Sequence, residues 1–191
     1  MPTVLSHAIA ATALGQWYPN RRLPAKFWLW TAMCALLPDV DVIGFPLGIR
    51  YDDMLGHRGL THSIPFAVVV GFVAARSCAK SNTLGFGIWD LEFGIWPLWI
   101  YFTAITASHG LLDAFTNGGR GIAFFAPFSN HRFFFPWRPI QVSPIGVGFF
   151  SARGLAVLQS ELRWILLPSV IIALLARMRV RLKRDTTGTI E

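Results

Sequence analysis

Charged residues are scarce in this sequence. Only 14% of its 191 residues are Asp, Glu, Lys or Arg, whereas a soluble domain usually carries roughly 25%. Hydrophobic residues make up 53%, and they include eight Trp and sixteen Phe. This shortage of charge argues against an ordinary soluble domain and predicts a protein that lies in or on a membrane.

Cysteine is also scarce, with Cys34 and Cys78 alone and no CxxC motif. Their spacing predicts neither a disulfide framework nor a thiolate metal site. Because both lie in or near apolar sequence, we interpret them as small buried residues.

Acidic residues are fewer than basic ones, which leaves a net charge of +7. Ten of the seventeen basic residues fall in three stretches beside apolar runs, at 20–26, 76–80 and 177–184. This placement is typical of the cytoplasmic loops of membrane proteins, whereas a nucleic-acid-binding domain usually gathers Lys and Arg on a soluble face. We therefore expect membrane lipids, and not nucleic acid, as partners.

Five apolar segments follow one another along the chain, at 4–18, 27–37, 64–75, 93–108 and 162–176. Most are shorter than the roughly 20 residues of a simple membrane-spanning helix. They are either core helices of a soluble protein or spans completed by polar residues at their ends, and the aromatic content and basic flanks favour the second. With few alternating patterns, the sequence predicts an all-α, compact integral membrane bundle of about five apolar helices. One domain would cover residues 1–180, with a polar tail at 181–191.

Local signals set some expected boundaries. Pro38 predicts that the second helix ends near Leu37, because the residue before a proline avoids the helical region. Ser63 or Thr61 can cap the third helix. Residues 114–160 form a long aromatic stretch, which we expect to be a loop in the membrane interface or a lid over a site, with His131 exposed on it.

A small set of histidine, aspartate and arginine residues interrupts the apolar sequence: His7, Asp39, Asp41, His57, Arg58, His62, His109 and Asp113. The motif HGLLD places its His and Asp four apart, on one face of a helix, although a helix-end His with an Asp cap would look the same. The motif PDVD would point both carboxylates the same way if its backbone is extended, and an Asx turn is the alternative.

The two histidines of HRGLTHS are five residues apart, about 140° around a helix, so they can converge only if one lies in a loop. Buried charged and imidazole groups are costly unless paired or coordinated. Imidazole and carboxylate donors without thiolate suit zinc, manganese or iron. Seven potential ligands exceed one tetrahedral site, which allows one or two ions.

Alternating membrane crossings would bring all these polar groups to the same side. The basic stretches would then lie on the opposite, cytoplasmic side, so the site would face the periplasm. Arginines on the site side, Arg58 and Arg120 among them, count against this orientation.

The order of these motifs resembles that of a known family. An early histidine, PDVD, HRGLTHS, SHGLLDAFTNGG and FFFPWRPI follow one another as in the YdjM-like family, over about residues 1–180. Its members are bacterial inner-membrane-associated proteins that are predicted to be metal-dependent hydrolases. The resemblance implies an integral protein of the bacterial inner (cytoplasmic) membrane with a metal-dependent hydrolase site.

A more distant similarity is to zinc-dependent phospholipase C and related single-strand nucleases, helical proteins that bind a cluster of zinc ions through His and Asp. Their His-x-x-x-Asp pair matches His109 and Asp113. His7, Asp41 and His62 would correspond to further ligands. A second His-x-x-x-Glu pair is missing after Asp113, which leaves the number of ions open.

Together these observations predict a membrane-bound metal-dependent hydrolase of phosphoesters, and its location suggests a lipid substrate. The main expected metal ligands are His7, Asp41, His62, His109 and Asp113. Asp39 would be a further ligand, a bridging carboxylate or a general base, and His57 a ligand or a proton donor. Arg58 would clamp a phosphate or contact lipid headgroups. A membrane metal-ion or proton transporter, and a non-catalytic membrane adaptor with a structural metal, are the alternatives.

Overall fold

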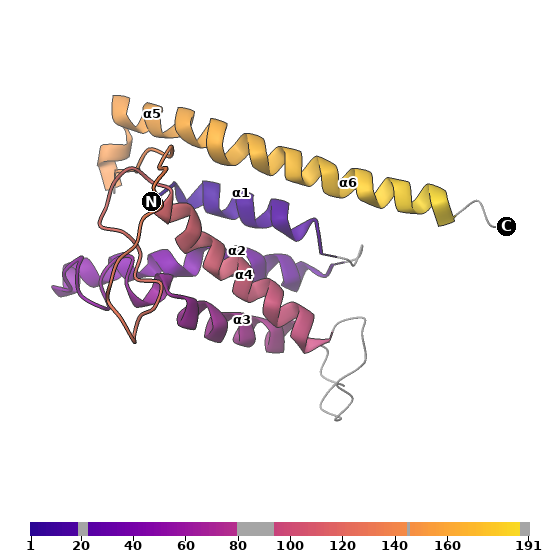
Figure 1. Cartoon of the computed structure of the whole chain (residues 1–191), viewed down its shortest axis with the longest axis horizontal. Coiled ribbons are helices and arrows are strands. Elements are labelled where there is room, and N and C mark those ends of the chain that lie inside the picture. Colours follow the sequence, from indigo (N-terminus) through magenta and orange to yellow (C-terminus); the bar gives the residue numbers. More distant parts are fainter. Residues whose placement is uncertain (19–22, 80–93, 145, 188–191) are drawn as a thin grey trace.

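The chain folds into packed helices, and a long irregular segment, residues 115–144, lies across one end of them (Figure 1). The computed structural model describes residues 1–18, 23–79, 94–144 and 146–187. In chain order the elements are α1 (Val4–Gly15), α2 (Ala25–Leu36), the 3₁₀ helices η1 (Leu37–Leu47) and η2 (Leu60–His62), α3 (Ile64–Cys78), α4 (Ile95–Ala114), the 3₁₀ turn η4 (Gly146–Phe149), α5 (Ala152–Glu161), the π-helical turn η5 (Leu162–Leu166) and α6 (Leu167–Thr187). Within the described ranges there is no strand, only isolated bridges, so the all-α class is confirmed.

The core lies between α2, α3 and α4. Phe27, Leu98 and Phe102 are fully buried there. Helices α3 and α4 approach closely at Gly71, where an added Cβ would lie 2.5 Å from the backbone nitrogen of Thr103. This close packing fixes α4, whose last turn carries part of the site.

The predicted helix boundaries at the site end of the bundle are confirmed. Helix α2 ends at Leu36, two residues before Pro38. Ser63 is the N-cap of α3, and its hydroxyl accepts a hydrogen bond of 3.2 Å from the backbone of Phe66. Both boundaries hold site residues just outside a regular helix.

The irregular segment covers the site end and is shorter than predicted. It is tied down by the backbone of Ala123, which donates to the carbonyl of Arg58 (3.0 Å), and by the carbonyl of Phe124, which accepts from Ile64 (2.9 Å). The expected loop over 114–160 is wrong at its C-terminal end, where α5 forms. Helix α5 holds a run of only four apolar residues, at 155–158, so it did not stand out as an apolar segment.

The first part of the predicted polar tail, residues 181–187, is helical, because α6 continues to Thr187. Residues 188–191 lie outside the described part of the chain, as do residues 20–22 and Lys80 of the basic stretches and residue 93 of the fourth apolar segment.

The number of membrane-spanning helices was overestimated. Among the described helices, one stretch, Ala25–Leu47, is long and apolar enough to cross a membrane, whereas about five were expected. Helices α1 and α3 are apolar, but they have only 12 and 15 residues. A buried core helix of a soluble protein would pass the same test, so length and composition alone do not establish a span.

Candidate metal centre

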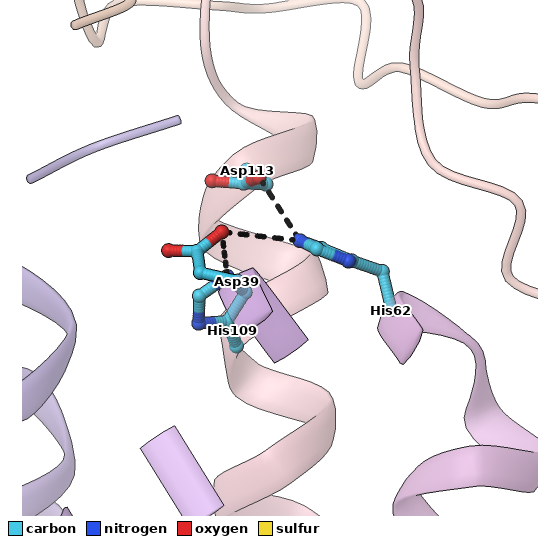
Figure 2. Close-up of side chains that lie close together, drawn as sticks. All are labelled: Asp39, His62, His109 and Asp113. Atoms are coloured by element: carbon cyan, nitrogen blue, oxygen red, sulfur yellow. Dashed lines mark ion pairs between the residues drawn. The ribbon is translucent and has the colours of Figure 1, made fainter. Parts of the chain in front are cut away.

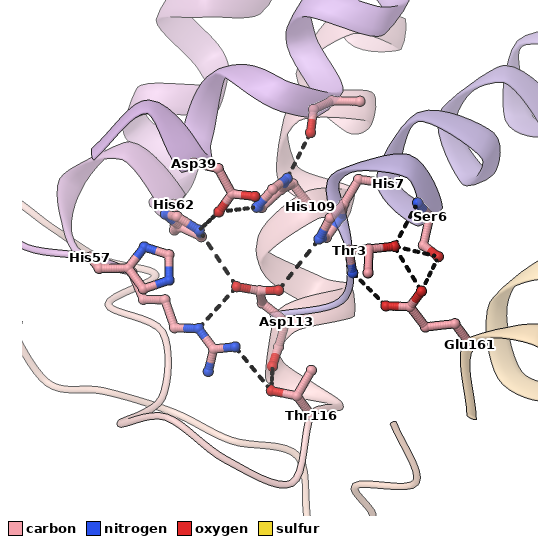
Figure 3. Close-up of polar contacts among 12 residues, drawn as sticks. Thr3, Ser6, His7, Asp39, His57, His62, His109, Asp113, Thr116 and Glu161 are labelled. Carbon is pink, nitrogen blue, oxygen red and sulfur yellow. Dashed lines mark hydrogen bonds and ion pairs between the residues drawn. The ribbon is translucent and has the colours of Figure 1, made fainter. Parts of the chain in front are cut away.

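Histidine and aspartate side chains from four separate segments meet at one end of the bundle. Figure 2 shows Asp39, His62, His109 and Asp113, and Figure 3 adds His7. His7 comes from the start of α1, Asp39 from η1 and His62 from η2, directly before α3. His109 and Asp113 come from the last turns of α4. All are buried, and none is more than 8% exposed.

The facing atoms in this group form no hydrogen bonds with one another. His109 Nε2 lies 3.3 Å from Asp39 Oδ1, and His62 Nε2 lies 3.6 Å from Asp39 Oδ1 and 3.6 Å from Asp113 Oδ2. On the other side of Asp113, its Oδ1 lies 3.5 Å from His7 Nε2. All these atoms are buried, and none has a hydrogen-bond partner in the described part of the chain.

Buried polar atoms are normally hydrogen-bonded, so this arrangement needs another explanation. A tetrahedral ion with ligand distances of about 2.0–2.1 Å has ligand atoms about 3.3–3.4 Å apart. Asp39, His62, His109 and Asp113 can each place one ligand atom within 4.8 Å of the others. The donor set therefore fits a metal ion, and the buried His/Asp group could hold one.

The remaining ring nitrogens of two histidines are held by the protein. His109 Nδ1 lies 2.7 Å from the carbonyl of Ala35, and His62 Nδ1 lies 3.2 Å from Asp41 Oδ2. A partner on Nδ1 fixes the tautomer and leaves Nε2 for a metal, as is usual for metal-binding histidines. His7 has no such partner, and its ring stacks on that of His109 with centroids 3.7 Å apart.

Asp41 and His57 form a different kind of contact. His57 Nδ1 lies 2.7 Å from Asp41 Oδ1, a normal hydrogen bond. The other oxygen of Asp41 accepts from the Thr61 hydroxyl (2.7 Å) and from the backbone of Arg58 (3.1 Å). Asp41, His57 and His62 satisfy the distance criterion for a second metal group, but these hydrogen bonds already use the carboxylate oxygens of Asp41.

Asp39 and Asp41 therefore point in different directions, whereas an extended backbone would have pointed both the same way. They lie in the 3₁₀ helix η1, which has three residues per turn, so positions two apart differ by about 240°. Asp39 reaches Nε2 of His62 and Asp41 reaches Nδ1 of the same ring. The structure places Asp39 in the main group and Asp41 behind it, the reverse of the emphasis expected from the sequence.

Arg58 lies inside the protein with its guanidinium fully buried. Nε lies 3.0 Å from Asp113 Oδ2, and the terminal nitrogens donate to the carbonyl of Gly118 (2.9 Å) and the hydroxyl of Thr116 (3.0 Å). A Cβ at Gly119 would lie 2.4 Å from this guanidinium. In this arrangement Arg58 holds Asp113, and its buried guanidinium is not exposed to a phosphate or a lipid headgroup.

The charge around His62 favours a cation. Burial alone would lower the pKa of His62, but the surrounding carboxylates of Asp113, Asp39 and Asp41 raise that pKa to about 10. Without a metal, the cluster therefore holds a proton on this ring. With a metal, the ion replaces that proton, because a histidine ligand must be neutral.

One buried acidic residue near the site was not expected from the sequence. Glu161 is 1% exposed, and its carboxylate accepts hydrogen bonds from the first turn of α1 (Figure 3). In the sequence it looks like an ordinary polar residue of a surface helix, and only its four-residue spacing from Val157 and Ile165, both buried, could have indicated an inward position.

Comparison with known proteins identifies the chain's relatives. The family model described as YdjM inner membrane protein matches residues 1–185. The chain belongs to the YdjM inner membrane protein family. It is also 35% identical over 173 residues to the inner membrane protein YbcI of Escherichia coli strain K12, with 90% of this chain and 95% of that protein covered. The resemblance found in the sequence is thus confirmed, and an inner-membrane location is supported.

No solved structure matches the chain. For this member of the YdjM family, the chemistry of the site is therefore inferred from its own residues.

Proposed function

We propose that this chain is a membrane-bound, metal-dependent hydrolase of phosphoesters whose site binds one or two divalent ions, with zinc preferred over manganese or iron. The observation that carries the proposal is the group of buried carboxylate and imidazole atoms that face one another without hydrogen bonds. Carboxylate and imidazole donors without thiolate suit these metals.

When bound, such an ion lowers the pKa of a water molecule and stabilises negative charge that develops on oxygen. The chain's own residues would supply proton transfer and orientation. Asp41 holds Nδ1 of His57, which leaves Nε2 of that ring to pass a proton to the leaving group. Arg58 fixes the Asp113 carboxylate, and Asp39 serves as a ligand.

A lipid phosphoester is the proposed substrate class. Large side chains are exposed on the irregular segment that covers the site end, with Phe128 at 85% and Trp137 at 57% exposure. Aromatic side chains are enriched where a membrane meets water, so this segment would lie at the interface and bring the site to the lipid headgroups.

We further propose that the protein is integral and that the site faces the periplasm. The basic end of α6 lies at the opposite end of the molecule from the site (Figure 1), and basic residues favour the cytoplasmic side. Arg120 and Arg138, at the site end, oppose this orientation, so a cysteine-labelling experiment on an exposed position such as Phe128→Cys in intact cells would test it.

Metal content is the first test. Detergent-purified protein should carry about one or two zinc, manganese or iron ions per chain by mass spectrometry, and an Asp39→Ala/His109→Ala double variant should carry none. His131→Ala, which changes an exposed histidine, is the matched control. Phosphoester substrates, soluble and lipid, would then be screened with the loaded protein. A folded parent that cannot be loaded with metal would overturn the proposal.

One observation favours a second candidate, a non-catalytic membrane adaptor with a structural metal. The donor atoms are buried, and structural metal sites are usually closed, whereas catalytic ones keep a position open to water or substrate. In an adaptor, ligand substitutions would lower the melting temperature and no phosphoester would be cleaved. A metal-dependent rate that is lost in His57→Gln, with the melting temperature kept, would exclude this role.

A further inference from the structure

Glu161 is a buried carboxylate outside the metal-binding group. It is the last residue of α5, and with Val157 and Ile165 it forms the buried face of that helix and the following π-helical turn. An ionised carboxylate among apolar residues is costly unless its oxygens are hydrogen-bonded. Its partners should therefore explain why an acidic residue occupies this position.

Among the described residues, the carboxylate of Glu161 accepts hydrogen bonds from the N-cap and first turn of α1. Its oxygens accept from the Thr3 backbone, from the Thr3 hydroxyl (2.7 Å) and from the Ser6 hydroxyl (2.8 Å) (Figure 3). Thr3 is the N-cap of α1. Because a helix N-terminus carries partial positive charge, a carboxylate is stabilised there, so Glu161 holds the start of α1.

His7 directly follows Ser6 in this turn. Neither of its ring nitrogens has a hydrogen-bond partner among the residues that the structure describes, although the residue is only 2% exposed. Two things therefore orient the His7 ring so that its Nε2 faces Asp113. One is its stacking on His109, and the other is the position of the α1 backbone. The other end of α1 is tied separately, by the Trp17 indole, which donates to the carbonyl of Ile172 (3.0 Å).

We propose that Glu161 is a positioning residue of the metal centre, which through Thr3 and Ser6 holds the His7 imidazole against Asp113. This inference rests on the proposed metal-binding function. It connects α5 and α6 to the histidine of the metal-binding group whose ring has no hydrogen bond among the described residues.

A double-mutant cycle on metal affinity tests this role in the full-length, detergent-purified protein. Cobalt(II) is the probe, since its absorption spectrum reports the ligands around it. Removing residues that orient a ligand typically lowers metal affinity about 10–100-fold. We expect Glu161→Ala to weaken cobalt binding by about that factor, Glu161→Gln by less, and His7→Ala by as much as Glu161→Ala. The double variant Glu161→Ala/His7→Ala should bind cobalt no more weakly than His7→Ala.

Thr31→Val is the matched control. It removes a buried hydroxyl that bonds within the core, to the Phe27 carbonyl and to Tyr101, so it should lower stability without changing the cobalt spectrum or affinity. Losses that add in the double variant, or a Glu161→Ala spectrum identical to that of the parent, would show that Glu161 only stabilises the fold.

Hydrogen exchange of the metal-free protein keeps the two proposals separable. Exchange of residues 3–15 should increase in Glu161→Ala and not in Thr31→Val. If the parent binds no metal, the hydrolase proposal and the positioning role at a metal centre both fail, and faster exchange in Glu161→Ala would then show a purely structural contact. If the parent binds metal but Glu161→Ala leaves exchange and affinity unchanged, only the positioning role fails.

Discussion

The two His–Asp groups at the end of the bundle use the same residue types and differ in their spacing. In the outer pair, His57 and Asp41 are 2.7 Å apart and satisfy each other. In the main group, the histidine and aspartate atoms stay 3.3–3.6 Å apart and no hydrogen bond satisfies them. The difference indicates that spacing, and not residue type, separates a hydrogen-bonded pair from a group that could hold a metal ion. His62 joins the two, with one ring nitrogen in each.

The largest effect is expected where the main group loses its central carboxylate. Asp113→Asn should abolish metal binding and leave the guanidinium of Arg58, which is fully buried, without its charge partner. Breaking a buried ion pair in this way costs about 3–5 kcal/mol. Metal analysis and denaturant unfolding would measure both effects.

The exposed pair Arg50–Asp53, whose side chains are 85% and 42% exposed, provides the control for Asp113. Asp53→Asn should change stability by about 1 kcal/mol or less and keep the metal. If Asp113→Asn kept its metal and unfolded like the parent, the main group would not be a cation site.

The second effect concerns the chemistry of the hydrogen-bonded pair. His57→Gln should lower the rate of phosphoester hydrolysis about 10²–10⁴-fold, the usual contribution of a proton-transfer residue, while metal content stays unchanged. Steady-state kinetics with metal analysis would show this, and His131→Gln is the control. Loss of metal in His57→Gln would instead make His57 a ligand and join the two groups into one.

A smaller effect should distinguish the two aspartates of PDVD. Asp41 supports His62 from behind, so Asp41→Asn should weaken metal affinity about 10–100-fold, whereas Asp39→Asn should remove measurable binding. Competition with a chelating dye would give both affinities. Equal losses would mean that the two carboxylates have equivalent roles and would contradict the division between the groups.

The smallest effect is on the pH dependence of the metal-free protein. Because the pKa of His62 is raised to about 10 from 6.5, its protonation stabilises the fold fully below about pH 6.5. That stabilisation is lost as the pH rises through 10. Melting temperatures should therefore fall over this range more in the metal-free parent than in metal-free His62→Gln. Parallel curves would show that His62 is not protonated by the carboxylates around it.

The gathering of the site at one end of a helical bundle could be predicted from the sequence, because each candidate residue falls near the end of an apolar segment. The N-cap of α3 at Ser63 and the end of α2 before Pro38 could also be predicted, since both depend on local backbone preferences. The order of the motifs along the chain also predicted the YdjM family, which the comparisons confirm.

The roles of Asp39 and Asp41 could not be predicted, because they depend on whether PDVD is extended or 3₁₀-helical, which the bundle decides. The sequence predicted that Arg58 contacts a phosphate or a lipid headgroup, and this was wrong because the backbone conformation could not be predicted either. Its backbone is left-handed, with φ 64°, a conformation rare outside glycine, and this turns its side chain inward. Glu161 was missed because its partners lie more than 150 residues away in the chain.

The cover over the site has a consequence for how a metal enters. The candidate ligands all lie at or before residue 113, whereas the segment that closes over them and the carboxylate that holds α1 follow at 114–161. At about 5–20 residues per second, a ribosome needs roughly 2–10 s to add these 48 residues. On the proposed metal-binding function, the ligands would be available to ions during synthesis before their cover exists, and a protein starved of metal at that stage would have to unfold part of its cover to be loaded later.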